Sequence, residues 1–462
     1  MTHDYKKLGL KSGLEIHQQL DTNKLFCDCP SLLRTDEPQY EIHRTLNPVI
    51  GETGIVDIAV KHEASQNKNF TYQVYDTNCL VETDEEPPHT INQEALKIAL
   101  QIAHLLNCKI FPVAQIMRKT VTDGSNTSGF QRTALIGHDG HITLSSGKQI
   151  AIDYLMLEED SARKVSGQHD TIFKLDRLGI PLVEIATGPH MNTPDEIKEA
   201  ALKLGEILRA CKVKRGLGTI RQDVNISIKG SERVEIKGFQ DPRMMQKTID
   251  TEITRQEKCI KEKSCQNEVR NALPNGTTEF LRPMPGAARM YPETDHPLLK
   301  ISKELINKTK KDLPKLLSEN TSYLQDQGIN PELIKLILKK NKLEDFKILT
   351  HEYNNPNLIA KMLTLFQTKP EISIQNMEEI LGKIAKGTIP KTDAKTIMQK
   401  ISQGMSLEEA TEKSSIDLKS EAESIIKEKP GLSQGAYMGL LMAKFKGQVS
   451  GKEIADTLKK LI

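Results

Sequence analysis

The sequence contains no tryptophan, and aromatic residues make up only 4% of its 462 residues. A protein that stacks nucleic-acid bases on a broad aromatic surface needs more such side chains. Long apolar runs are also missing, because no stretch approaches the roughly 18 residues that a membrane-spanning helix requires. The composition therefore argues against a base-stacking platform and against an integral membrane protein.

An excess of charge of one sign is lacking as well. The 64 lysines and arginines nearly balance the 62 acidic residues, leaving a net charge of +2. This excludes a uniformly basic nucleic-acid coat but allows a local basic face. Residues 1–7 lack the apolar segment of a signal peptide, so we expect a cytoplasmic protein without membrane contact.

Cysteines are few and scattered, as expected for free thiols in an intracellular chain. Cys27 and Cys29 have the spacing of half a zinc site, but no C-x-x-C follows them to supply the other half. The sequence therefore favours two ordinary thiols here.

The expected secondary structure changes from mainly strands to helices near residue 300. Up to about 295, strand-like alternation is interrupted by two helices, one after Asn92 and one that begins at Thr193-Pro194, where Thr193 and Glu196 form a capping box. Beyond it, lysine-rich amphipathic helices are expected at 301–317, 331–340 and 374–384. We predict the α+β class, with a large mixed, mainly antiparallel β cradle (1–295), an all-α helical domain (296–405) and a small helical tail (406–462).

Four polar side chains are candidates for a metal site. Glu15 and His17 are spaced i, i+2 on an expected strand, so they point to the same face and together suit a divalent cation. Glu158 follows an apolar strand within three consecutive acids, where a solvent-exposed turn is the alternative. Glu184 lies in an apolar strand, where a carboxylate is costly unless it binds a cation or an arginine.

Two further segments are candidates for binding phosphate or a nucleotide. Residues 123–132 form a Gly-rich loop whose backbone N–H groups could face phosphate oxygens, although a plain surface turn explains it equally well. A hairpin around Gly230-Ser231 carries Asp223 and Glu235 on its polar face, which suits either cross-strand ion pairs or Mg²⁺ with a nucleotide. The proline-rich segment 282–295 is either a linker or a surface for an anionic partner.

Several segments in order resemble the B/E family of tRNA-dependent amidotransferase subunits, and the loop 123–132 and segment 285–295 are most similar to its archaeal E type. The segments that carry the resemblance are 14–20, 123–132, 157–160, 176–185, 215–228 and 289–295. The resemblance implies an ATP-dependent enzyme that phosphorylates the γ-carboxylate of Glu-tRNA(Gln), after which ammonia displaces the phosphate to give Gln-tRNA(Gln).

The resemblance also implies roles for individual residues. Glu15, His17, Glu158 and Glu184 are expected to be catalytic and to bind Mg²⁺, with Glu158 preferred over Glu159. The helical tail is expected to contact tRNA, including through Lys444 and Lys446. The residues expected to contact ATP are Gly124, Ser125, Asn126, Thr127, Ser128, Arg132, Asp223 and Glu235.

The implied partner is an asparaginase-like glutaminase of the D type, in a heterotetramer with two copies of each polypeptide. Archaeal E-type chains carry a large synthetase-like insertion where this sequence has only about residues 257–276. The chain therefore resembles a trimmed form, with its kinase residues retained. The alternatives are a B-type member of a trimeric Asp/Glu-tRNA amidotransferase and a non-catalytic tRNA-binding scaffold.

Overall fold

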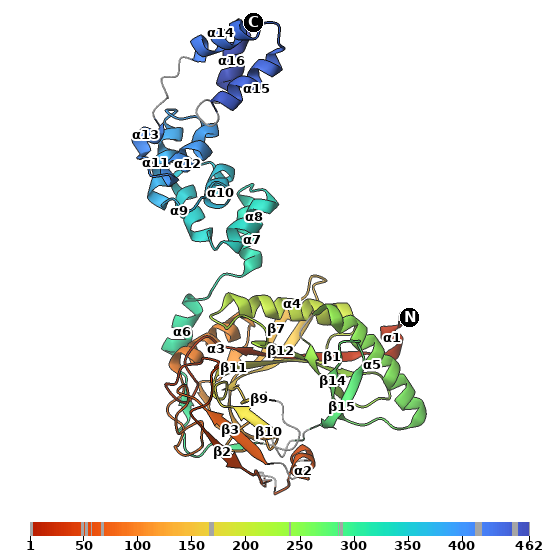
Figure 1. Ribbon diagram of the computed structural model, residues 1–462. Coiled ribbons are helices and arrows are strands. Elements are labelled where there is room, and N and C mark those ends of the chain that lie inside the picture. Colours follow the sequence, from red (N-terminus) through yellow and green to blue (C-terminus); the bar gives the residue numbers. More distant parts are fainter. Residues whose placement is uncertain are drawn as a thin grey trace. The chain divides into compact units, whose positions relative to one another are not determined.

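The computed structural model describes residues 3–47, 50, 54–56, 58–65, 69–165, 171–239, 242–284, 286, 290–411, 418–445 and 451–461. The chain divides into two compact units, residues 1–316 and 317–462 (Figure 1). Among the described helices, none has both the length and the apolar character needed to cross a membrane. The separation of residues 296–405 from 406–462 as domains stays a prediction.

A large mixed sheet is the centre of the first unit, which confirms the expected α+β class. Adjacent strands of this sheet pair antiparallel, except that β13 and β14 are parallel. Short β4 (Lys109–Ile110) pairs with β7 at the side. The strand order is β15 (Thr278–Pro283), β14 (Glu268–Ala272), β13 (Val234–Phe239), β12 (Ile220–Ser227), β1 (Lys11–Gln19), β11 (Pro181–Thr187), β8 (Gln149–Glu159), β7 (Phe130–Thr143), β6 (Ile116–Thr120) and β16 (Met290–Pro292).

Two smaller sheets complete the strands of the described residues. One has the order β2 (Tyr40–Arg44), β3 (Phe70–Val74), β10 (Thr171–Lys174) and β9 (Arg163–Val165). The other pairs β5 (Val113–Ala114) with β17 (Leu299–Lys300).

Helices α3 (Gln93–Leu105), α4 (Pro194–Ala210) and α5 (Pro242–Glu262) cover one face of the large sheet (Figure 1). Leu14 and Ile16 of β1 belong to the same buried cluster as Ala99, Leu204 and Ile249 of these helices. Because side chains alternate along a strand, the residues between them face away from this core. The remaining helices of this unit are α1 (Tyr5–Leu8), α2 (Ile58–Ala64) and α6 (Lys303–Lys311).

Both helix starts predicted from the sequence are confirmed. Asn92 accepts hydrogen bonds from the N–H groups of residues 94 and 95, both at 3.0 Å. Thr193 Oγ1 accepts one from Glu196 N at 3.2 Å, and Pro194 is the first helical residue. The return bond of the expected capping box differs by one residue, since the Glu196 carboxylate accepts from Asn192 N at 2.7 Å.

The second unit is helical in its described residues. The helices expected at 331–340 and 374–384 are confirmed as α8 and α11, whereas the one expected at 301–317 ends as α6 at Lys311, because Pro314 cannot continue it. The helices of this unit are α7 (Leu317–Asp326), α8 (Pro331–Lys339), α9 (Leu343–Glu352), α10 (Pro356–Thr364), α11 (Ile374–Ala385), the 3₁₀ turn η2 (Lys391–Asp393), α12 (Ala394–Ser402), α13 (Leu407–Thr411), α14 (Leu418–Glu428), α15 (Gln434–Lys444) and α16 (Gly451–Leu461).

Candidate active site

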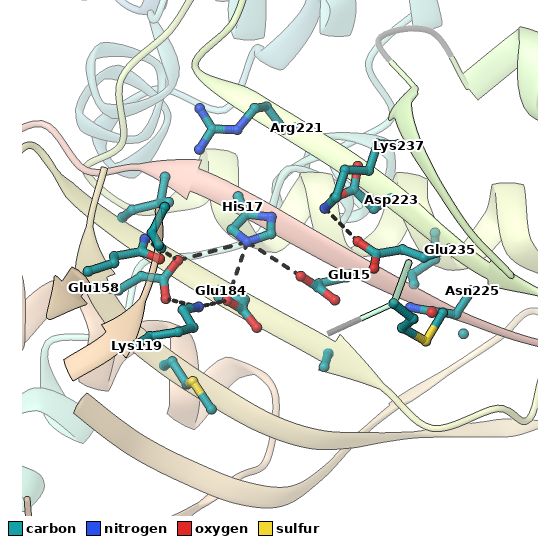
Figure 2. A pocket seen from close by; sticks show the side chains of 18 of the residues that line it. Glu15, His17, Lys119, Glu158, Glu184, Arg221, Asp223, Asn225, Glu235 and Lys237 are labelled. Carbon is teal, nitrogen blue, oxygen red and sulfur yellow. Dashed lines mark hydrogen bonds and ion pairs between the residues drawn. The ribbon is translucent and has the colours of Figure 1, made fainter. Parts of the chain in front are cut away.

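Three adjacent strands bring the four candidate metal ligands together. Glu15 and His17 lie on the open face of β1, and His17 is opposite Glu184 of β11 in the register of the two strands. Glu158 comes from β8, the next strand beyond β11. All four side chains line one cavity of about 1030 Å³, and Figure 2 shows them pointing toward one another.

His17 is the centre of this cluster. Its Nε2 lies 3.3 Å from Glu184 Oε2, 3.6 Å from Glu15 Oε1 and 3.8 Å from Glu158 Oε1. The sequence-based expectation that Glu158 rather than Glu159 faces this group agrees with these distances. The role of each residue in catalysis stays a prediction.

Three side chains of the site were missed by the sequence analysis. Lys119 of β6 donates to Glu158 at 2.8 Å and to Glu184 at 3.1 Å. Tyr154 donates to Glu184 at 3.1 Å, and Gln131 donates to Glu158 at 2.9 Å. The sequence around Lys119 carries no motif, so only the strand order could have indicated its place.

The carboxyl groups of the cluster have different proton affinities. Burial and the charge of Glu184 raise the pKa of Glu15 to about 7. Burial also raises the pKa of Glu158, and the charge of Lys119 only partly opposes this. Burial acts in the same direction on Glu184, but the charge of Lys119 and the contact with His17 hold the Glu184 pKa well below its usual range.

His17 responds to the same charges in the opposite sense. Burial alone would lower its pKa, but the hydrogen bond and charge of Glu184, helped by two further carboxylates, raise it to about 9. The cluster therefore holds more negative charge than it can keep ionised without additional cations.

The donor set fits a divalent cation. One atom each of His17, Glu158 and Glu184 lie within 4.8 Å of one another, and the same holds for Glu15, His17 and Asp223. His17 Nδ1 is buried and has no hydrogen-bond partner among the described residues. Carboxylate oxygens with one imidazole suit Mg²⁺ or Mn²⁺, so the residues present fit the metal that the resemblance implies.

A second charged group lies beside the first, on the polar face of the β12–β13 hairpin. Lys237 Nζ lies 2.8 Å from Asp223 Oδ2 and 2.5 Å from Glu235 Oε1. Asp223, Asn225, Glu235 and Lys237 all line the cavity (Figure 2). The hairpin thus carries one cross-strand ion pair of the kind that the sequence suggested, between Lys237 and Asp223, and a second pair within β13, between Lys237 and Glu235.

The Gly-rich loop 123–132 is divided between the cavity and the protein interior. Ser125 and Asn126 line the cavity. Thr127 donates to the Glu82 carbonyl at 2.7 Å, and Ser128 donates to the Phe130 carbonyl at 3.0 Å, so these two hydroxyls serve the local backbone.

Gly124 allows a close approach to the small sheet. Its carbonyl accepts a hydrogen bond from Tyr72 Oη at 2.8 Å, its φ is +85°, and a Cβ there would lie 2.2 Å from the Phe70 ring. Gly124, Thr127 and Ser128 do not line the cavity, so their predicted contact with ATP has no support from this placement.

Arg132 is committed to a buried ion-pair cluster. Its Nε donates to Glu293 at 2.9 Å, and its guanidinium lies 3.4 Å from Glu159. Arg118 also pairs with Glu293. Neither arginine lines the cavity, so the position of Arg132 does not favour its predicted contact with phosphate. Glu159 pairs with Arg132 and does not line the cavity that contains the candidate metal ligands.

The proline-rich segment 282–295 is more than a linker. It leaves β15 at one edge of the large sheet and enters β16 at the other edge. Arg282, Met284, Gly286 and Met290 line the cavity between these edges. Residues 285 and 287–289 lie outside the described residues.

Cys27 and Cys29 have two further neighbours that the sequence did not indicate. Cys27 and Cys29 lie with Cys79 and Glu82, and one donor atom of each is within 4.8 Å of the others. Cys27 Sγ contacts Glu82 at 2.9 Å, and the buried ammonium of Lys24 lies 3.1 Å from the same carboxylate oxygen. Folding thus supplies two neighbours from about 50 residues downstream, although the cysteines are free thiols here.

Comparison with known proteins identifies related chains. Residues 10–307 match the family described as the GatB/GatE catalytic domain. The E-type polypeptide of glutamyl-tRNA(Gln) amidotransferase from Methanocaldococcus jannaschii is 36% identical, over 100% of this chain and 99% of its own length. The proteins of the same name from Archaeoglobus fulgidus and Pyrobaculum neutrophilum are 33% and 30% identical, each over at least 99% of both chains.

These alignments also report a difference in length. The alignment with the Methanocaldococcus chain extends over 627 positions, whereas this chain has 462 residues. The relative therefore has about 165 residues without a counterpart here, the difference between those two numbers. This agrees with the expectation of a chain that lacks a large insertion.

Proposed function

The chain belongs to the GatB/GatE family, and from this membership we propose that it is the E-type component of a tRNA-dependent amidotransferase, a carbon–nitrogen ligase. Its substrate would be Glu-tRNA(Gln), and its product Gln-tRNA(Gln). The observation that supports this most is the convergence of Glu15, His17, Glu158 and Glu184 in one cavity.

The proposed reaction has two steps. An oxygen of the substrate γ-carboxylate attacks the γ-phosphorus of ATP, and ADP leaves, so that the carboxylate becomes an acyl phosphate with a good leaving group. The nitrogen of ammonia then attacks the acyl carbon, loses a proton, and inorganic phosphate leaves. The product is the γ-amide.

The residues of the cavity support these steps through charge. Glu15, His17, Glu158 and Glu184 would hold Mg²⁺, which when bound supplies positive charge to the phosphate oxygens. Lys237 and Arg221 line the same cavity and offer fixed cations to a polyphosphate. Asp223, Glu235, Ser125 and Asn126 are the predicted ATP contacts that the structure brings to this space.

The partners belong to the proposal as well. We propose that a glutaminase of the asparaginase-like D type supplies ammonia, in a cytoplasmic heterotetramer with two copies of each chain. The relatives are themselves named as parts of a larger amidotransferase. The tRNA would contact the helical second unit, where Lys444 now pairs with Glu421 at 2.6 Å, while Lys446 lies outside the described residues.

The test is amidation of Glu-tRNA(Gln) with ATP, Mg²⁺ and ammonium chloride, because ammonium replaces the glutaminase. We expect Gln-tRNA(Gln) with one ATP consumed per amide. Glu184→Ala should lower this activity by more than about 100-fold while tRNA binding persists. Glu279→Ala, an exposed change on β15, is the matched control.

Each negative outcome has a separate meaning. No product from the chain alone, with product when the glutaminase is added, would show that the partner is obligatory. No product in either case, despite tRNA binding, would favour the scaffold alternative. Full activity of Glu184→Ala would contradict the metal assignment.

A further inference from the structure

Lys119 crosses the site from a distant strand. It lies on β6, whereas the two carboxylates that it contacts lie on β8 and β11, two and three positions away in the strand order. Only 10% of its side chain is exposed, and the two carboxylate side chains are 1% and 5% exposed. A buried ammonium with two carboxylate partners is a costly arrangement that the fold nevertheless retains.

The ammonium contacts a carboxylate oxygen that also faces the histidine of the candidate metal site. Lys119 Nζ is 2.8 Å from Glu158 Oε2 and 3.1 Å from Glu184 Oε2. The same oxygen of Glu184 is 3.3 Å from His17 Nε2. Glu184 Oε2 is therefore shared by the lysine and by the histidine of the candidate metal site, as Figure 2 shows.

We propose that Lys119 is an internal competitor of the divalent cation: it holds Glu158 and Glu184 together while no metal is bound, and it releases them when a metal binds. This inference rests on the proposed function, because it assumes that His17, Glu158 and Glu184 bind the metal. Because two positive charges that share one carboxylate oxygen repel each other, the ammonium and a divalent cation would each weaken the other's binding to Glu184. Lys119 is thus a positioning residue that sets the metal affinity.

A purely structural role of Lys119 predicts a different effect of its removal on metal affinity. If Lys119 only neutralised a buried charge, its removal would destabilise the fold and leave metal binding unchanged or weaker. If it competes with the metal, its removal takes one positive charge away from Glu158 and Glu184, and these carboxylates then attract a divalent cation more strongly. The two roles differ in the sign of the change in metal affinity.

The experiment is a calorimetric titration of the full-length chain with Mn²⁺. We expect Lys119→Met to bind Mn²⁺ about tenfold more tightly than the unmodified chain, because one competing charge is gone. Lys119→Arg keeps the charge and should bind as the unmodified chain does. Glu279→Ala, the exposed control change on β15, should also leave Mn²⁺ binding unchanged.

A thermal unfolding series gives an independent reading. Without metal, Lys119→Met should melt below the unmodified chain, and Mn²⁺ should raise its melting temperature by more than it raises that of the unmodified chain. Equal or weaker Mn²⁺ binding by Lys119→Met would overturn the inference.

A further test uses the unmodified protein and therefore remains valid even if the Lys119→Met variant misfolds. Acetylation of Lys119 by acetic anhydride, followed by mass spectrometry, should increase when Mn²⁺ is added, since the amine is released from its carboxylates. Lys24, whose side chain is fully buried against Glu82, is the internal control. Labelling of Lys119 that does not change with Mn²⁺ would contradict the release.

Failure of the inference and failure of the proposed function are separable. If the unmodified chain binds no Mn²⁺, the metal site itself is wrong and the inference falls with it. If the unmodified chain binds Mn²⁺ and Glu184→Gln does not, the metal site stands. A lack of tighter binding by Lys119→Met then refutes only the role of Lys119.

Discussion

Glu293 illustrates how a single buried carboxylate joins three strands. It follows β16 and pairs with Arg118 of β6 and with Arg132 of β7, and it is 1% exposed. Burial alone would raise its pKa, but hydrogen bonds from Arg118, from the Asp295 N–H and from Arg132 outweigh burial and lower the pKa. Its ionised form is therefore bound more strongly in the folded chain than in the unfolded one.

This asymmetry predicts a dependence of stability on pH. A carboxyl group whose pKa is lower in the folded state stabilises the fold above its unfolded pKa of about 4.3, and this contribution is lost as the pH falls toward the folded value. Glu293→Gln should cost about 3 kcal/mol at pH 7, since it removes the buried carboxylate that Arg118 and Arg132 share.

Melting temperatures measured from pH 7 to pH 3.5 test this. The gap between the unmodified chain and Glu293→Gln should narrow as the pH falls below about 4.3. Glu279→Gln, at an exposed position, should show no gap at any pH. A gap that is constant across this range would show that the carboxylate charge contributes nothing.

At the scale of the element, helix α4 tests how much one cap contributes. Thr193→Ala removes the hydroxyl that accepts from Glu196 N. We expect it to reduce the free energy of unfolding by about 1 kcal/mol, measured by urea denaturation followed by circular dichroism. Thr254→Ala, at an exposed threonine inside α5, is the matched control and should stay within about 0.5 kcal/mol. Equal effects of both changes would argue against a specific role of the cap.

Elements whose signals are local were predictable from the sequence. The strand of Glu15 and His17, the starts of α3 and α4, and the β12–β13 hairpin all follow from periodicity, caps and turns within about ten residues. The end of α6 was misplaced because the apolar periodicity continued past Pro314, which stops a helix regardless of pattern.

Pairings between distant segments were not predictable in the same way. Lys119 meets Glu184 across 65 residues, and Arg132 meets Glu293 across 161 residues. The loop 123–132 carries the residue types of a phosphate-binding loop, but Thr127 and Ser128 bind backbone carbonyls instead. Composition indicates which groups can bind phosphate, whereas the tertiary contacts decide which of them remain available.

At the scale of the whole molecule, the candidate site belongs entirely to the first unit. The residues that line the cavity end at Met290, and the family match ends at residue 307, both before the boundary at residue 316. The second unit has its own buried clusters, one around Phe346 and one around Tyr437. Each unit thus has a core that does not depend on the other unit's residues.

We therefore expect residues 1–316 to fold when expressed alone. This fragment should bind Mn²⁺ with an affinity within about threefold of the full chain, since no ligand is lost. Circular dichroism and Mn²⁺ titration test this, with Glu184→Gln in the same fragment as the control that should not bind. An unfolded fragment would show that the first unit needs the second for stability.

The segment that connects β15 to β16 limits how far apart the two edges of the large sheet can lie. Seven residue steps separate Pro283 from Met290, and a chain of that contour length reaches at most about 25 Å. Ten strands at a spacing of about 4.8 Å would place the two edges of a flat sheet about 43 Å apart. The sheet must therefore curl until β15 and β16 are close enough for this segment to connect them. The number of residues in the segment thus sets the greatest possible distance between the two edges. Substitutions in the segment leave that limit unchanged, whereas each inserted residue would extend it by about 3.5 Å.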